Sequence, residues 1–128
     1  REEGIEHAWQ RHRYHHLALR AGFEAMGLEF LVAENERLPQ LNAVVIPAGA
    51  DDVAVRSRLL HDYQLEIGAG LGVLAGKVWR IGLMGHGCNQ KNVLYCLGAM
   101  DAVLGYMGAE INQGAGVKAA MDYYSARS

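Results

Sequence analysis

The first 26 residues carry an apolar stripe at helical spacing. Its positions follow one another at steps of three and four residues, which places them along one face of a long helix. The stripe consists of Ile5, Trp9, His12, His16, Leu19, Phe23 and Met26. Gly27 follows at once and predicts the end of this helix, because glycine adopts the left-handed conformation of a C-cap without strain.

Two further helices are predicted by N-cap residues that precede amphipathic segments. Asp51 or Asp52 caps a helix that runs to about Asp62, with apolar residues at 55, 59 and 60. Asn89 caps another helix, whose apolar residues recur at helical spacing until the glycines at 105 and 108.

Short runs of apolar and β-branched residues predict four strands, at 28–32, 41–46, 64–67 and 77–83. The order helix, strand, strand, helix, strand, strand, helix favours a two-layer α+β domain, with helices packed on one face of a small, mostly antiparallel sheet. We assign residues 1–107 to this domain. Residues 108–128 are rich in Gly, Ala and polar groups, so we expect a loosely attached C-terminal tail or a short extra helix.

Composition and charge exclude several classes of partner. The chain has 128 residues, of which 51% are hydrophobic and 20% charged, so it is long enough for one globular domain with its own core. The net charge of −2 implies no strongly basic surface, which argues against nucleic acid as the main partner. No apolar run reaches the ~18 residues that a membrane-spanning helix needs, so we expect no membrane partner.

Cysteine content and the chain ends bear on the compartment. The two cysteines, Cys88 and Cys96, are too few for a disulfide framework and suit a reduced environment. The N-terminal residues show no signal peptide, and the final Ser-Ala-Arg-Ser does not fit the Ser-Lys-Leu signal of peroxisomal proteins. We therefore expect an intracellular, cytoplasmic protein.

Arg80 is the strongest candidate for a binding residue. It lies alone in the apolar run 77–83, which contains no acidic residue to pair with it. A guanidinium keeps its proton and presents a planar fork of donors that matches a carboxylate or a phosphate. Strand alternation places Trp79 and Ile81 toward the helices and Arg80 on the opposite, free face. The alternative is a structural ion pair, for example with Glu66 on the neighbouring strand.

The glycine-rich stretch before Arg80 does not predict a nucleotide site. Residues 70–75 fit the letters of a dinucleotide fingerprint, but a strand follows them where that motif requires a helix. Gly76-Lys77 resembles the end of a phosphate-binding loop, yet Leu71 and Val78 replace the glycine and the Ser or Thr of that motif. The stretch is therefore either a flexible connection or a loop that lies against a ligand or a second domain.

The other reactive side chains predict no metal or nucleophilic site. His12, His15 and His16 could share one helical face, but no acidic or cysteine ligand accompanies them at a known spacing. The cysteines lack a His–acid arrangement, and the three lysines lack a desolvated setting. His86, in the loop after the Arg80 strand, either lines a pocket or simply leads into the next helix.

Five segments of the chain together carry a likeness to a known family: residues 38–39, 45–49, 63–72, 76–85 and 92–93. The most specific of them is the glycine loop followed by Gly-Lys-Val-Trp-Arg-Ile-Gly. With these segments the chain resembles the C-terminal domain of the alanine–glyoxylate and serine–pyruvate aminotransferases, in class V of the pyridoxal-phosphate enzymes. The resemblance spans about residues 5–107 and leaves out the tail.

The resemblance implies a transaminase that uses pyridoxal 5'-phosphate. Such an enzyme moves an amino group between a small amino acid, alanine or serine, and a 2-oxo acid, glyoxylate or pyruvate. The matching arginine, Arg80, would bind the substrate α-carboxylate, and Gly70, Leu71, Gly72 and His86 are candidate cleft-lining residues. No catalytic residue is expected in this chain.

This chain also differs from the family pattern in one large respect. In the family, a large domain precedes the matching segment and carries the Schiff-base lysine and the phosphate-binding residues, and the resemblance implies a full-length homodimer. We therefore expect a C-terminal domain that lacks its large partner domain. Two other hypotheses remain at this stage: a free-standing carboxylate-binding or regulatory module, and a structural module whose Arg80 face docks another domain.

The isolated 128-residue chain is expected neither to transaminate nor to bind pyridoxal phosphate tightly, because the cofactor-binding residues of the family have no counterpart in it. Spectrophotometric titration with pyridoxal phosphate checks this expectation. Cofactor absorbance that saturates at one equivalent would contradict it.

Overall fold

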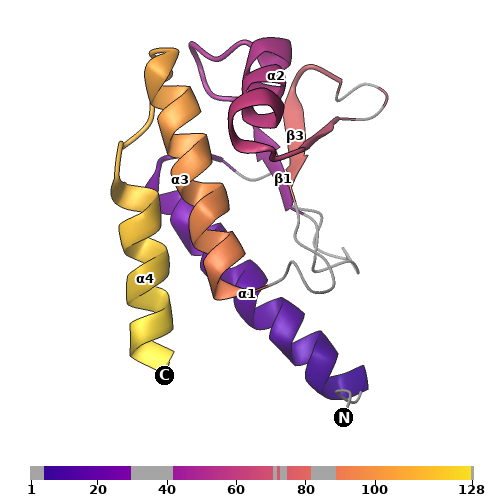
Figure 1. Ribbon diagram of the computed structural model, residues 1–128, viewed down its shortest axis with the longest axis vertical. Helices are drawn as coiled ribbons and strands as arrows, with labels where there is room; N and C mark the ends of the chain where they lie inside the picture. Colours follow the sequence, from indigo (N-terminus) through magenta and orange to yellow (C-terminus); the bar gives the residue numbers. More distant parts are fainter. Residues whose placement is uncertain (1–4, 30–41, 71, 73–74, 82–88, 128) are drawn as a thin grey trace.

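A computed structural model describes residues 5–29, 42–70, 72, 75–81 and 89–127 of the chain. It contains four helices and a three-stranded sheet (Figure 1). The helices are α1 (Ile5–Ala25), α2 (Asp52–Tyr63), α3 (Gln90–Tyr106) and α4 (Ala115–Arg127). The strands are β1 (Asn42–Val45), β2 (Gly68–Ala69) and β3 (Val78–Ile81). None of the helices in these described ranges is long and apolar enough to span a membrane.

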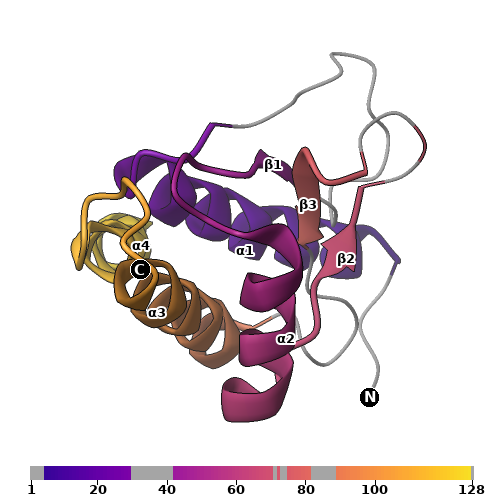
Figure 2. The same ribbon diagram turned by 90° about the horizontal axis from the view of Figure 1, so that it is seen from above.

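The sheet has the order β1-β3-β2, and both pairings are antiparallel. Helices α1, α2 and α3 lie on one side of it, and α4 lies outermost against α1 and α3 (Figure 2). The predicted α+β class is therefore confirmed. Because β3 is the central strand, Trp79 and Arg80 each have a register partner on both neighbouring strands.

Alternation along β3 separates a core face from an opposite face. Trp79 and Ile81 are 0% and 2% exposed and belong to the hydrophobic core that the three inner helices cover. Arg80 points the other way and is half-buried, as the sequence predicts. Val78 is also buried, although it lies outside that core cluster, so the opposite face is not open along its whole length.

The predicted N-caps of α2 and α3 are confirmed. The Asp51 carboxylate accepts a hydrogen bond from the backbone N–H of Ala54 at 2.9 Å. The Asn89 side chain accepts one from the backbone N–H of Asn92 at 2.8 Å. Each cap satisfies a donor that the first turn of a helix leaves without a partner.

The predicted strand at 64–67 is wrong. Helix α2 ends in a left-handed cap at Gln64, whose φ is 54°, and the N–H of Leu65 bonds back to the carbonyl of Leu59. These bonds close the helix, so the residues that follow cannot pair with β3 at once. The strand is displaced into Gly68–Ala69, where the sequence shows only glycine-rich chain.

The strand predicted at 28–32 falls mostly outside the described residues. Leu28 and Glu29 are not in a strand. The carbonyl of Glu29 nevertheless accepts a hydrogen bond from the N–H of Val45 at 2.7 Å, so the chain passes beside the end of β1 here.

The last 13 described residues, Ala115–Arg127, form an extra helix, α4, rather than a loose tail. Ala120 and Tyr124 on this helix are buried in the core. Helices α1 and α4 cross where two glycines meet: a Cβ at Gly22 would lie 2.9 Å from the Gly116 carbonyl oxygen. Such a close approach of two helix backbones is possible only without side chains at the crossing.

The connection between α3 and α4 is also tied to the rest of the domain. Asn112 donates its backbone N–H to the carbonyl of Met26 at 2.8 Å and its side-chain amide to the carbonyl of Ala25 at 3.1 Å. The Asp101 carboxylate accepts the N–H of Gly114 at 2.5 Å. Asn112 thereby satisfies carbonyls at the end of α1 that have no partner within the helix.

Substituting Gly22→Ala is expected to destabilise the domain by about 1–3 kcal/mol, because the new methyl group overlaps the α4 backbone and the Leu97 side chain. Gly98→Ala in α3 is the matched control. Its Cβ would meet nothing closer than 3.9 Å, so the better helix propensity of alanine should stabilise the domain by up to ~1 kcal/mol. Urea denaturation of both variants measures the difference, and a neutral Gly22→Ala would contradict the tight crossing.

Candidate functional site

The Arg80 side chain is held against β2. Its Nε–H donates a hydrogen bond to the carbonyl oxygen of Ala69 at 2.9 Å. Gly68 is the register partner of Arg80 on β2, and a Cβ at Gly68 would lie 3.2 Å from the Nη2 atom. The guanidinium therefore lies close to β2 at a residue that has no side chain.

The tip of Arg80 has no protein partner within the described residues. No carboxylate there lies within ion-pair distance of Arg80, and Glu66 is exposed rather than paired with it. The structural ion pair with Glu66 is thus not formed. Ala69 accepts only from the Nε–H, so among the described residues the two Nη groups have no partner and could both donate to one anion.

Two of the four candidate cleft-lining residues, Gly70 and Gly72, lie in the described part of the chain. Gly70 is buried, and its N–H donates to the carbonyl of Val78 at 3.1 Å. Gly72 is exposed with φ of 58°, a conformation that disfavours side chains. Gly70 is thus hydrogen-bonded to β3, whereas Leu71 and His86 lie outside the described residues. The cleft-lining role of all four residues remains a prediction.

Sequence reasoning missed a polar contact behind Arg80. The indole Nε1–H of Trp79 donates to Oδ1 of Asp52 at 2.7 Å. Arg56 donates two hydrogen bonds to the same carboxylate, with Nε 2.9 Å from Oδ1 and Nη2 3.3 Å from Oδ2. The only sequence signal is the spacing of Asp52 and Arg56 one helical turn apart, which says nothing about Trp79, 27 residues further on.

The Asp52 carboxyl has a lowered pKa. The hydrogen bond from Arg56 is the largest cause, partial burial opposes it, and the Trp79 N–H and the Arg56 charge lower the pKa further. The carboxylate is therefore ionised at neutral pH, which keeps it a strong acceptor for the buried indole N–H.

The remaining reactive groups form no second site in the described part of the chain. Burial raises the pKa of the Cys96 thiol to about 12, so it is not a nucleophile at neutral pH. His15 Nδ1 lies 2.7 Å from the hydroxyl of Tyr124 in an aromatic contact between α1 and α4. The described residues contain no group of three or more His, Cys, Asp or Glu side chains that could hold a metal ion.

The lysines of this chain do not fit a covalent cofactor site. All three lie in the described residues and are exposed: Lys77, Lys91 and Lys118. A lysine that forms a Schiff base is instead desolvated, because water stabilises the protonated, unreactive ammonium. None of the three exposed lysines has that setting in this structure.

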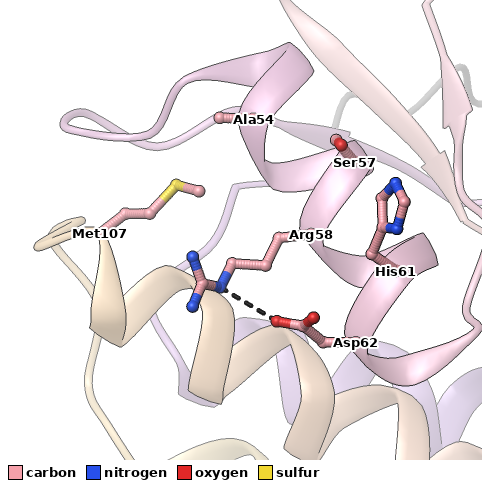
Figure 3. Close-up of a pocket in the computed structure, with 6 residues that line it drawn as sticks. All are labelled: Ala54, Ser57, Arg58, His61, Asp62 and Met107. Atoms are coloured by element: carbon pink, nitrogen blue, oxygen red, sulfur yellow. Dashed lines mark ion pairs between the residues drawn. The ribbon is translucent and has the colours of Figure 1, made fainter.

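A surface hollow of about 370 Å³ lies between α2 and the end of α3 (Figure 3). Arg58 lines it, but this arginine pairs with Asp62 at 3.3 Å and lies 3.9 Å from the centre of the Tyr106 ring. The lining residues are Ala54, Ser57, Arg58, His61, Asp62 and Met107. Arg80 is not among them, so this hollow is separate from the Arg80 face.

Comparison with curated proteins finds aminotransferases. The chain is 44% identical over 123 residues to the (S)-ureidoglycine–glyoxylate transaminase of Bacillus subtilis, covering 96% of the chain and 30% of that protein. It is 39% identical over 93 residues to the alanine–glyoxylate aminotransferase of Mus musculus, covering 72% of the chain and 22% of that protein. The chain thus spans less than a third of the length of these relatives. No protein-family profile matches it.

Comparison with solved structures gives the same result. The ureidoglycine–glyoxylate aminotransferase of Bacillus subtilis superimposes with a TM-score of 0.91 at 43% identity, over 96% of this chain and 32% of that one. Matches of this extent include residues beyond 107, so the likeness continues into the segment that holds α4. The expectation that the tail falls outside the resemblance was too narrow.

The stability of the domain is expected to fall at low pH partly through Asp52. Because its folded-state pKa is lowered, the ionised carboxylate contributes stability above the unfolded pKa of about 3.9, and this contribution is lost as the pH falls through the folded-state pKa. Asp52→Asn should therefore lose less stability than wild type between pH 7 and pH 3, as measured by urea denaturation at each pH.

The control is Asp122→Asn, which removes an exposed ion pair with Lys118 and should change the free energy of unfolding at pH 7 little. An Asp52→Asn variant whose stability falls with acid as steeply as that of wild type would show that the Asp52 pair contributes nothing.

Proposed function

Because the chain matches the C-terminal part of the class V aminotransferases, we propose that it is the small domain of a transaminase that acts on a small amino acid and a 2-oxo acid. Enzymes of this class depend on pyridoxal phosphate. The proposed amino donors are alanine and serine, and the proposed acceptors are glyoxylate and pyruvate. The chain itself contributes the group that binds the substrate carboxylate, Arg80.

The observation that carries this proposal is the open fork of Arg80. Its Nε–H is occupied by Ala69, while its two Nη groups have no partner among the described residues. A carboxylate that meets both Nη groups forms two parallel, charge-assisted hydrogen bonds, which fix its orientation as well as its position. The amino acid is thereby held in one direction while the reaction takes place at its α-carbon.

The protein environment of Arg80 suits this role. The Ala69 bond fixes the guanidinium before a ligand arrives, so little side-chain freedom remains to be lost on binding. Partial burial strengthens the attraction to an anion, because fewer water molecules compete for the donors. The absence of a side chain at Gly68 allows the guanidinium to lie close to β2, where the Ala69 carbonyl is within reach.

The rest of the active site is proposed to lie in a part of the enzyme that this chain does not include. The cofactor, when bound, accepts the electrons of the substrate α-carbon, and it requires a desolvated lysine that none of the three exposed lysines provides. Homodimerisation of the complete enzyme and a cytoplasmic location complete the proposal.

Arg80→Lys in the intact enzyme is expected to raise the KM for alanine by about 10- to 100-fold, because one ammonium cannot reproduce a bidentate fork worth ~1.5–3 kcal/mol. Steady-state kinetics with alanine and glyoxylate measure this change. The bound-cofactor absorbance should stay at the wild-type level, since Arg80 does not hold the cofactor.

Arg58→Lys serves as the matched control, because that arginine lines the separate hollow on α2. Its KM should equal that of wild type. An Arg80→Lys enzyme with an unchanged KM for alanine would refute the assigned role of Arg80.

A further inference from the structure

We propose that Asp52 is a positioning residue for Arg80, acting through the indole of Trp79 and the backbone of Ala69. The inference rests on the proposed function of Arg80 as the carboxylate-binding group. Asp52 lies in the first turn of α2, on the core side of the sheet, so it does not touch the ligand itself. Its effect on binding has to pass through β3 and β2.

The first step is the anchoring of Trp79. The indole is 0% exposed, and its single polar atom, Nε1, is satisfied by Oδ1 of Asp52 at 2.7 Å. A buried N–H without a partner is costly, so the ring keeps the one orientation in which this bond forms. The side chain of Trp79 therefore cannot rotate or shift along the core without losing that bond.

Arg56 makes Asp52 a fixed acceptor rather than a mobile one. Its guanidinium binds both carboxylate oxygens, and the two residues lie one turn apart on α2. The Asp52 side chain is only 18% exposed. A carboxylate bound through both oxygens in this way has a fixed orientation, so Oδ1 accepts from Trp79 in one geometry.

The second step runs through the sheet. Trp79 is the register partner of Ala69, and the carbonyl of Ala69 is the group that accepts the Nε–H of Arg80. Strand β2 is only two residues long, so few other ladder bonds hold Ala69 in place. A displacement of Trp79 would move β3 relative to Ala69 and weaken the bond that orients the guanidinium.

The third step is the geometry of the strand itself. Trp79 and Arg80 are neighbours with side chains on opposite faces, so a roll of the backbone that moves the indole also turns the Cα–Cβ direction of Arg80. Anchoring on the core face thus sets the direction of the fork on the other face. This connection is local and needs no change in the overall fold.

Trp79→Phe is the principal test, because phenylalanine keeps an aromatic ring in the core and removes the N–H. In the intact enzyme we expect the KM for alanine to rise about 3- to 10-fold with kcat within twofold of wild type, as the loss of one buried hydrogen bond implies. Asp52→Ala should behave in the same way. Asp52→Asn, which keeps an acceptor oxygen for the indole, should restore most of the wild-type KM.

A second measurement reports on Arg80 without turnover. In protein labelled with 15N-arginine, the Nε–H resonance of Arg80 is assigned by its disappearance in Arg80→Lys. Hydrogen exchange at this Nε–H should be about tenfold faster in Trp79→Phe than in wild type, because the bond to Ala69 is weakened. Combining Trp79→Phe with Arg80→Lys should add little to the KM of Arg80→Lys alone, since both act on one interaction.

The outcomes separate this inference from the proposed function. Wild-type KM and wild-type Nε–H exchange in Trp79→Phe, with only a lower melting temperature, would show that Asp52 and Trp79 are merely structural. If instead Arg80→Lys leaves the KM unchanged, the proposed function fails, while the exchange measurement still decides whether Asp52 positions the guanidinium. Should Asp52→Ala not fold, Trp79→Phe and Asp52→Asn carry the test.

Discussion

The central position of β3 is the constraint on which the rest of the domain depends. Both other strands pair with it, and its side chains enter the core on one face and leave it on the other. Because side chains alternate along a strand, the residue that completes the core and the residue that leaves it must be neighbours. Trp79 and Arg80 are that pair, so a core residue and the proposed carboxylate-binding residue are consecutive in the sequence.

The energetics of the two faces differ in kind. On the core face, burial of large apolar side chains such as Phe23, Leu59 and Trp79 supplies the stability, at about 1.5–3 kcal/mol for each aliphatic or phenyl side chain fully removed from water. On the other face, a charged group is kept half-buried with one hydrogen bond to the backbone, which contributes little to stability. An incompletely satisfied cation is what a binding function requires, since a fully paired one has no donors left for a ligand.

Most of the fold could be predicted from local features of the sequence. Contacts between residues far apart in the sequence could not. The caps at Asp51 and Asn89 and the exposed direction of Arg80 follow from neighbouring residues alone, so they could be foreseen. The prediction of a strand at 64–67 was wrong because α2 ends in a left-handed cap at Gln64. Glutamine has no strong preference for this conformation, so the sequence does not indicate the cap. The Asp52–Trp79 bond could not be inferred, because it joins side chains that only the packing of α2 on the sheet brings together.

The contacts of Asn112 have a consequence for how the chain acquires its structure. The end of α1 is completed by a residue 87 positions further along the sequence, and α1 packs chiefly on α4. During synthesis at ~5–20 residues per second, α1 therefore leaves the ribosome several seconds before its partner exists. In that interval the face of α1 that packs on α4 is uncovered, so this helix cannot reach its final packing until α4 has been synthesised.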